Sequence, residues 1–192
     1  IKIIIGIAIA VLILGGVTIF GVTQYQKKKA AKEYAESVKT YSDNLELATV
    51  TMLKGAGDAE DCGNLIKNVW YNAIYKEKDD ETDKYTRLDG YFVSDFNDAL
   101  GNLFVDSSFS SKIDSIDKNQ DTVNSLMKKL KNPPEEYKDA YDALSDFYDA
   151  YLALTGCATD PSGSLQTYSS TFNDADTDTL NSYKAMQQYL GD

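Results

Sequence analysis

An uncharged apolar run near the start of the chain limits what this sequence can fold into more than any other feature. From Ile3 to Val22 there is no charged residue, and Thr18 is the one polar side chain. Twenty residues of α-helix rise about 30 Å, which matches the hydrocarbon core of a bilayer. The run is apolar on every face, unlike a helix packed on a soluble core. It therefore predicts a transmembrane helix that contacts membrane lipid through residues 3–22.

A cleaved signal peptide is the alternative interpretation of this run. Signal peptides have an apolar region of about 7–15 residues, followed by a cleavage site of small residues. Here the run is longer and leads into Tyr25, Gln26 and three lysines, whereas the small residues Ala8 and Ala10 lie inside it. These features favour an uncleaved anchor with a basic flank over residues 1–29.

Charge separates this anchor from the rest of the chain. The 192 residues hold 19 Lys+Arg and 30 Asp+Glu, a net charge of −11. Residues 1–29 contain four lysines and no acid, which leaves 15 bases against 30 acids in residues 30–192. Such an acidic domain is a poor match for a nucleic-acid backbone, so no nucleic-acid partner is expected. The sequence has no histidine, which excludes Ser-His-Asp and Cys-His catalysis and the usual zinc sites.

The remaining motifs do not predict a metal, a cofactor or a catalytic residue. Asp174, Asp176 and Asp178 have the spacing that opens a calcium loop, but Thr179 and Ala185 stand where that loop needs glycine and glutamate. No glycine-rich phosphate loop occurs in the sequence. Pairs of acids are abundant, and on amphipathic helices such pairs usually form the solvated face.

Residues 30–192 have the hydrophobic periodicity of helices throughout, with apolar positions three and four apart. Glycines at 55 and 57 are expected to end the first helix, and Gly156 the fifth. Leu88 is placed on the inward face of the third. The expected helices cover residues 30–54, 58–78, 84–105, 109–131, 135–154 and 164–190.

These elements predict an all-α fold. Short loops make neighbouring helices antiparallel. The expected architecture is a single N-terminal transmembrane helix followed by an up-and-down bundle of about five to six helices, which forms one acidic domain over residues 30–192.

The two cysteines are predicted to form a disulfide. Alternating helix directions place Cys62, at the start of the second helix, and Cys157, after the fifth, at the same end of the bundle. A bridge closing this loop of 95 residues stabilises by up to about 4–5 kcal/mol in the chain-entropy model. Two unrelated buried thiols are the alternative. Disulfides persist outside the cytosol, so the pair favours an extracytoplasmic domain, although lysines 27–29 favour the cytoplasm on their side.

Four tyrosines on the fifth helix suggest a partner surface. A tyrosine at a helix interface can bury its ring and keep its hydroxyl in water, so packing at the bundle edge is the simpler interpretation. The alternative is a groove for a protein or a glycan, because tyrosine is enriched in binding sites. The residues concerned are Tyr137, Tyr141, Tyr148 and Tyr151.

Several segments resemble a group of bacterial proteins. They are N-V-W-Y-N-A-I-Y (68–75), M-K-K-L-K-N-P-P (127–134), Y-D-A-L-S-D-F-Y-D-A-Y (141–151) and P-S-G-S-L-Q-T-Y (161–168). These segments resemble N-terminally anchored envelope proteins of low-GC Gram-positive bacteria. The resemblance implies a cell-envelope setting and carries no enzymatic activity with it.

The function expected from the sequence is a non-enzymatic, cell-surface interaction or structural module, single-pass in the cell membrane with its C-terminal domain outside. Its partner would be a basic or neutral protein or envelope polymer, or a second copy of the chain through the anchor and first helix. A pilin-like filament subunit is one alternative, although Ile5 stands where common pilins carry glutamate. An envelope hydrolase using paired carboxylates is another.

Overall fold

The computed structural model describes the backbone of residues 2–190 and the side chains of residues 24–190. The chain divides into two compact units, Ile1–Asp43 and Asn44–Asp192. Helix α1 (Lys2–Tyr75) supplies residues 2–43 of the first unit and the first element of the second.

Charged side chains pair along the helix in the first unit. Lys29, Lys32 and Lys39 each lie within 4 Å of an acid one turn further on, with N–O distances of 3.7, 3.7 and 2.8 Å. Pairs at this spacing support a helix that is exposed to water. Each of these pairs therefore adds a small stabilisation to this part of α1.

The predicted membrane span, residues 3–22, lies outside the range whose side chains are described. Within the described part of the chain, no helix combines the length and the apolar character needed to cross a membrane.

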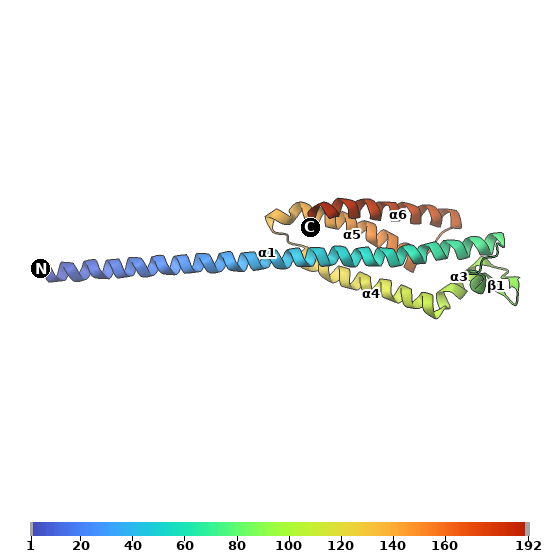
Figure 1. Ribbon diagram of the computed structural model, residues 1–192, viewed down its shortest axis with the longest axis horizontal. Coiled ribbons are helices and arrows are strands. Elements are labelled where there is room, and N and C mark those ends of the chain that lie inside the picture. The colour runs from blue at the N-terminus through green and yellow to red at the C-terminus, as the bar shows by residue number, and fades with distance from the viewer. Residues whose placement is uncertain (1, 191–192) are drawn as a thin grey trace. The chain divides into compact units, whose positions relative to one another are not determined.

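The second unit is a helical bundle, which confirms the predicted fold class at that level. After α1 come α2 (Asp83–Thr86), α3 (Phe96–Val105), α4 (Ser107–Leu130), α5 (Lys138–Thr159) and α6 (Leu165–Met186). Figure 1 shows that α4, α5 and α6 run in alternating directions. Short 3₁₀ helices precede α5 and follow α6, at Glu135–Tyr137 and Gln187–Tyr189.

The core of this unit is built from the apolar stripes that the sequence predicts. Phe109, Ile116, Val123 and Leu130 of α4 are buried, in agreement with the expected stripe. Gln120 interrupts that stripe, and its amide donates a hydrogen bond of 2.7 Å to the buried Thr155 hydroxyl. The largest fully buried side chains are Tyr151, Phe109, Phe147, Leu45, Met52, Ile66, Leu103, Ile116, Leu130, Leu144, Leu154 and Met186.

The predicted break at Gly55 and Gly57 is wrong, because α1 continues through both to Tyr75. The space beside Gly55 is filled by Asn119 of α4 and Tyr151 of α5, and the space beside Gly63 by Phe172 of α6. Glycine in a helix costs about 1 kcal/mol relative to alanine. Close packing of neighbouring helices on the glycine surface offsets this cost, which helix propensity alone does not reveal.

The predicted helix over residues 84–105 is also wrong. A two-stranded antiparallel hairpin, β1 (Arg87–Leu88) and β2 (Tyr91–Phe92), lies between α2 and α3. Asp89 and Gly90 form its two-residue loop, with φ of 50° and 87°. A two-residue loop with positive φ at both positions has a backbone twist that matches the twist of the flanking strands. Asp-Gly is one of the preferred sequences for such a loop.

The later helices differ from prediction only at their ends. Helix α5 passes Gly156 and ends at Thr159. Helix α6 is continuous from Leu165 to Met186. The Ser164 side chain accepts a hydrogen bond from the Thr167 amide and caps the start of α6.

Candidate partner-binding surfaces

The four tyrosines predicted as a partner surface do not form one surface. Tyr151 is 0% exposed. Its hydroxyl donates to Asn119 Oδ1 at 2.6 Å, and Asn119 Nδ2 donates to the Thr51 carbonyl at 2.9 Å. Burial raises the pKa of Tyr151 above its usual range. Tyr151 therefore joins α1, α4 and α5 inside the core, and its prediction as a surface residue is wrong.

Tyr141 and Tyr148 of α5 do lie together, in a shallow hollow against α4. The Tyr148 hydroxyl donates to Asn124 Oδ1. The hollow has a volume of about 420 Å³, and Met127, Lys128 and Lys131 complete its lining. Desolvation, together with the negative charge of Asp149, raises the pKa of Tyr148. Tyr137 is not part of this lining and is half-buried in the 3₁₀ helix before α5.

The two cysteines are free thiols in the structure, one buried and one half-buried. The Tyr168 hydroxyl lies 3.1 Å from the Cys157 carbonyl and 3.5 Å from the carbonyl of Gly63, the neighbour of Cys62. The backbones at Cys157 and beside Cys62 thus both lie within 3.5 Å of one hydroxyl. Burial raises the pKa of Cys62 to about 11, so this thiol is protonated and unreactive near neutral pH. The disulfide remains a prediction.

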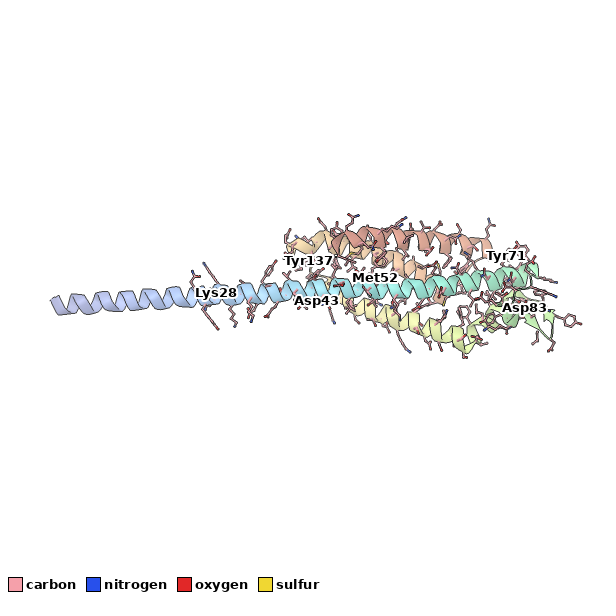
Figure 2. All side chains as sticks on the ribbon, in the orientation of Figure 1. Lys28, Asp43, Met52, Tyr71, Asp83 and Tyr137 are labelled. Carbon is pink, nitrogen blue, oxygen red and sulfur yellow. The ribbon has the colours of Figure 1, made fainter. Side chains whose placement is uncertain are left out.

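A different surface, which the sequence interpretation missed, lies at the end of the second unit where α1 finishes. Figure 1 shows β1 and α3 beside the end of α1, and Figure 2 places Tyr71 and Asp83 there, away from Tyr137. Twelve large apolar side chains are exposed in the described residues of this unit. Seven of them fall within residues 71–105: Tyr71, Ile74, Tyr75, Leu88, Tyr91, Phe96 and Val105.

The hairpin at this end is held by its own side chains. The Arg87 guanidinium donates to Asp83 Oδ2 at 2.5 Å and to the Gly90 carbonyl at 2.6 Å, and it lies over the Phe92 ring at 5.5 Å. Beyond the paired strands, the Val93 amide donates to the Thr86 carbonyl at 2.9 Å. These contacts bind the loop to α2 and fix the hairpin conformation.

Buried polar contacts and aromatic packing attach the hairpin region to the bundle. The Asn72 amide donates to the Thr82 hydroxyl at 2.8 Å in a buried position. Asn102 of α3 donates to the Tyr85 carbonyl at 2.9 Å. Trp70 of α1 packs against Phe96, with ring centroids 5.9 Å apart. The surface at this end is therefore fixed to the core.

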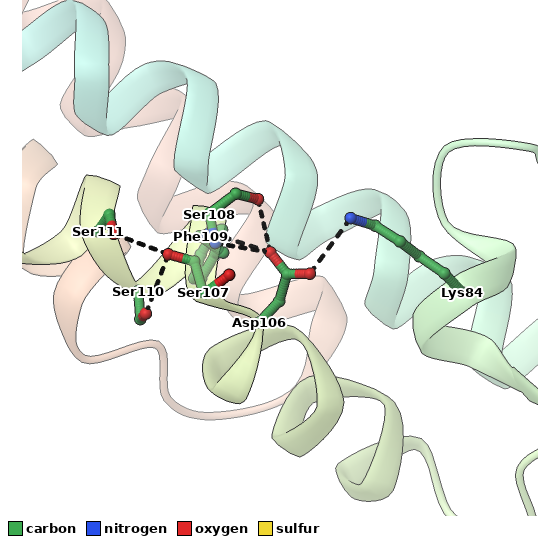
Figure 3. Close-up of polar contacts among 7 residues, drawn as sticks. All are labelled: Lys84, Asp106, Ser107, Ser108, Phe109, Ser110 and Ser111. Atoms are coloured by element: carbon green, nitrogen blue, oxygen red, sulfur yellow. Dashed lines mark hydrogen bonds and ion pairs between the residues drawn. The ribbon is translucent and has the colours of Figure 1, made fainter.

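Asp106 connects the same region to α4 (Figure 3). Its carboxylate accepts hydrogen bonds from the Ser108 hydroxyl at 2.5 Å and from the Phe109 amide at 3.1 Å, which caps the helix. Lys84 of α2 lies 3.3 Å from its other oxygen. The hydrogen bonds from Ser108 and Phe109, with Lys84 as a weaker influence, lower the pKa of Asp106 to about 2. The carboxylate is therefore ionised at neutral pH.

The described residues offer little for acid–base or metal chemistry. None of the Asp and Glu side chains within residues 24–190 is buried. In the same range, no three His, Cys, Asp or Glu side chains gather closely enough to hold a metal ion. Two hollows contain acid pairs, Asp61 with Glu81 and Glu60 with Asp176. Apart from the half-buried Asp176, these acids are exposed, whereas a catalytic acid normally needs partial desolvation.

Comparisons with protein-family models, with curated proteins and with solved structures gave no match to this chain.

The sequence does contain a signal for the missed surface. Asp89-Gly90 between Leu88 and Tyr91 is a strong short-range indication of a hairpin. The helical spacing of Leu88, Phe92 and Phe96 fits a helix equally well when only apolar positions are considered. The turn residues distinguish the two interpretations, because both loop positions need positive φ.

Proposed function

We propose that this chain is a single-pass membrane protein whose acidic helical domain binds a partner outside the cytoplasm and has no catalytic activity of its own. Residues 3–22 would cross the bilayer. The acidic domain that follows would remain in water on the outer side.

The observation that carries this proposal is the gathering of exposed apolar side chains at one end of the second unit. Scattered exposed hydrophobic residues are normal, but a group of them indicates an interaction site. Seven of the twelve lie within residues 71–105, on elements fixed to the core by Trp70, Asn72 and Asn102. Because these elements are held in place, a partner would bind without first having to order them.

The anchor rests on a separate argument from the sequence. The uncharged run from Ile3 to Val22 is long enough to cross a bilayer core. The excess of acids over bases in residues 30–192 favours a water-exposed domain that stays soluble.

Photo-crosslinking in the source cells tests partner binding. Benzoylphenylalanine replaces Val105 in the full chain, because Val105 is 80% exposed within the apolar group. A matched chain carries the same residue at Asp174, an exposed position on α6. We expect a discrete adduct from position 105 and none from position 174. Adducts of equal yield at both positions, or at neither, would contradict the proposal.

Protease protection tests the placement. Protease added to intact protoplasts should degrade the domain that carries residues 44–192, whereas a cytoplasmic marker protein stays intact. If the domain is degraded only after lysis, it lies inside the cell and the extracytoplasmic assignment fails.

A further inference from the structure

We propose that the hairpin tip, Leu88 to Tyr91, is the docking element of this domain, and that its protein partner presents an apolar pocket with a cationic rim. This inference rests on the proposed interaction function and names the part of the surface, and the partner chemistry, that would perform it.

The strand register makes the tip apolar on one face. Leu88 pairs directly with Tyr91, and Arg87 with Phe92. Residues directly opposite each other in a hairpin share a face and lie about 4.5–5.5 Å apart at Cβ. Arg87 and Phe92 are half-buried, whereas Leu88 and Tyr91 are 72% and 80% exposed. The outer face therefore presents one continuous Leu–Tyr surface to water.

The tip is also preorganised for binding. Arg87 binds the Gly90 carbonyl of the loop and Asp83 of α2 at the same time, so the loop is attached to α2. The positive φ values of Asp89 and Gly90 are those that a tight two-residue turn needs. A fixed element loses little conformational entropy on binding, so its apolar contacts contribute more of their free energy to affinity. Tyrosine is among the residues that most often dominate binding energy.

Charge around the tip determines what kind of partner fits. Residues 76–95 contain seven acids and four bases. Two of those bases are already paired, Arg87 with Asp83 and Lys84 with Asp106, which leaves six acids and two bases of this segment outside these ion pairs. Asp89 stands at the turn itself, between Leu88 and Tyr91. A pocket that accepts the apolar pair would gain from lysine or arginine around its rim, and an acidic partner would be repelled.

A random peptide library on phage tests this chemistry. The target is the full chain in micelles of an uncharged detergent. We expect enriched peptides to combine bulky apolar residues with lysine or arginine, and their affinity to fall as salt rises from about 50 to 500 mM. Leu88→Ser and Tyr91→Ser should each weaken binding by about tenfold or more.

Matched controls distinguish binding at the hairpin tip from nonspecific binding to other exposed apolar side chains. Leu180→Ser and Tyr25→Ser remove side chains of the same types that are 52% and 71% exposed elsewhere, and they should leave binding unchanged. Gly90→Ala strains the turn, since its φ is 87°, and should weaken binding although Leu88 and Tyr91 remain. Gly101→Ala, where a methyl group meets open space, is its control.

Two results would overturn the inference. Enrichment of acidic peptides, or of peptides without basic residues, would contradict the predicted rim. Binding that Leu88→Ser and Tyr91→Ser leave intact would show that the tip is not the docking element. That second result, combined with a discrete adduct at position 105, would leave the proposed interaction function standing.

Discussion

At the scale of single residues, the tyrosines of α5 show how burial separates side chains that look alike in sequence. Tyr151 and Tyr148 lie three residues apart on one helix. One is enclosed in the core with its hydroxyl on Asn119, and the other lies at a shallow hollow with its hydroxyl on Asn124. Their hydrogen bonds should therefore differ in their contribution to stability.

We expect Tyr151→Phe to lower the free energy of unfolding by about 1 kcal/mol, because it leaves the Asn119 carbonyl oxygen without this donor in a partly buried place. Tyr148→Phe should lower the free energy of unfolding by less, since a water molecule can replace the tyrosine hydroxyl as hydrogen-bond donor to Asn124. Urea denaturation of the full chain in micelles, followed by the fluorescence of Trp70, measures both. An equal decrease in the free energy of unfolding for the two variants would contradict the assignment of Tyr151 to the core.

Buried weak acids should make the domain sensitive to alkaline pH. Burial raises the pKa of Tyr151 and Tyr168 above 10 and, in the chain with reduced cysteines, that of Cys62 to about 11. In the unfolded chain the same groups ionise at their ordinary values, so the unfolded state loses protons first as pH rises. The contribution of these groups to stability is therefore complete below pH about 9 and is lost above it.

Thermal unfolding between pH about 7 and 11 measures this effect. The melting temperature should fall above pH about 9, and the fall should be less steep in Tyr168→Phe, which removes one titrating hydroxyl. A Tyr168→Phe variant with an unchanged pH profile would contradict the effect.

At the scale of secondary-structure elements, the glycines of α1 differ in what they contribute to packing and stability. Gly63 faces the ring of Phe172, whereas Gly57 has open space beside it. Both lie inside the same helix. The first permits close packing of α6, and the second simply weakens the helix.

These two glycines give opposite predictions. Gly57→Ala should stabilise by about 0.5–1 kcal/mol, because alanine is the better helix former. Gly63→Ala should destabilise by about 1–3 kcal/mol, because the added methyl group would overlap the Phe172 ring. Urea denaturation of the two variants, each compared with the natural chain, tests the sign of both changes. A stabilising Gly63→Ala would show that α6 does not pack on α1 at this position.

Hydrophobic periodicity predicted α4, α5 and α6 well but failed between residues 84 and 105. Helices α4 and α5 have stripes that face neighbours, so the pattern and the burial agree. In the region of β1 and β2 the pattern suggests an inward-facing Leu88, which is in fact exposed. A stripe of apolar residues shows which side chains could share a face, and it cannot show whether anything covers that face.

At the scale of the whole molecule, the redox state of the two cysteines bears on which side of the membrane the domain lies. Tyr168 lies close to the backbone beside both cysteines, and an oxidising compartment would favour their disulfide. We expect this disulfide in the chain isolated from its source cells.

The measurement must avoid a false result, because the buried Cys62, with a pKa of about 11, resists alkylation in the folded chain even when it is reduced. Cells are therefore quenched with acid, and the protein is unfolded before a polymer-linked maleimide is added. We expect no mass shift without prior reduction and two additions after it. Two additions without reduction would exclude the disulfide and remove one argument for extracytoplasmic placement.

The sequence by itself determined the helical character of the domain, its acidic surface and the candidate membrane run, because periodicity, charge and turn chemistry are local properties. The Asp89-Gly90 turn is also a local property of the sequence. The Asp-Gly pair predicts a hairpin, although the helical spacing of the neighbouring apolar residues favoured a helix. Only the tertiary structure decided that α1 continues through Gly55, that Tyr151 points into the core and that Leu88 and Tyr91 remain exposed. Each of these outcomes depends on which distant segment packs, or fails to pack, against a given face, and that choice is made by the fold as a whole.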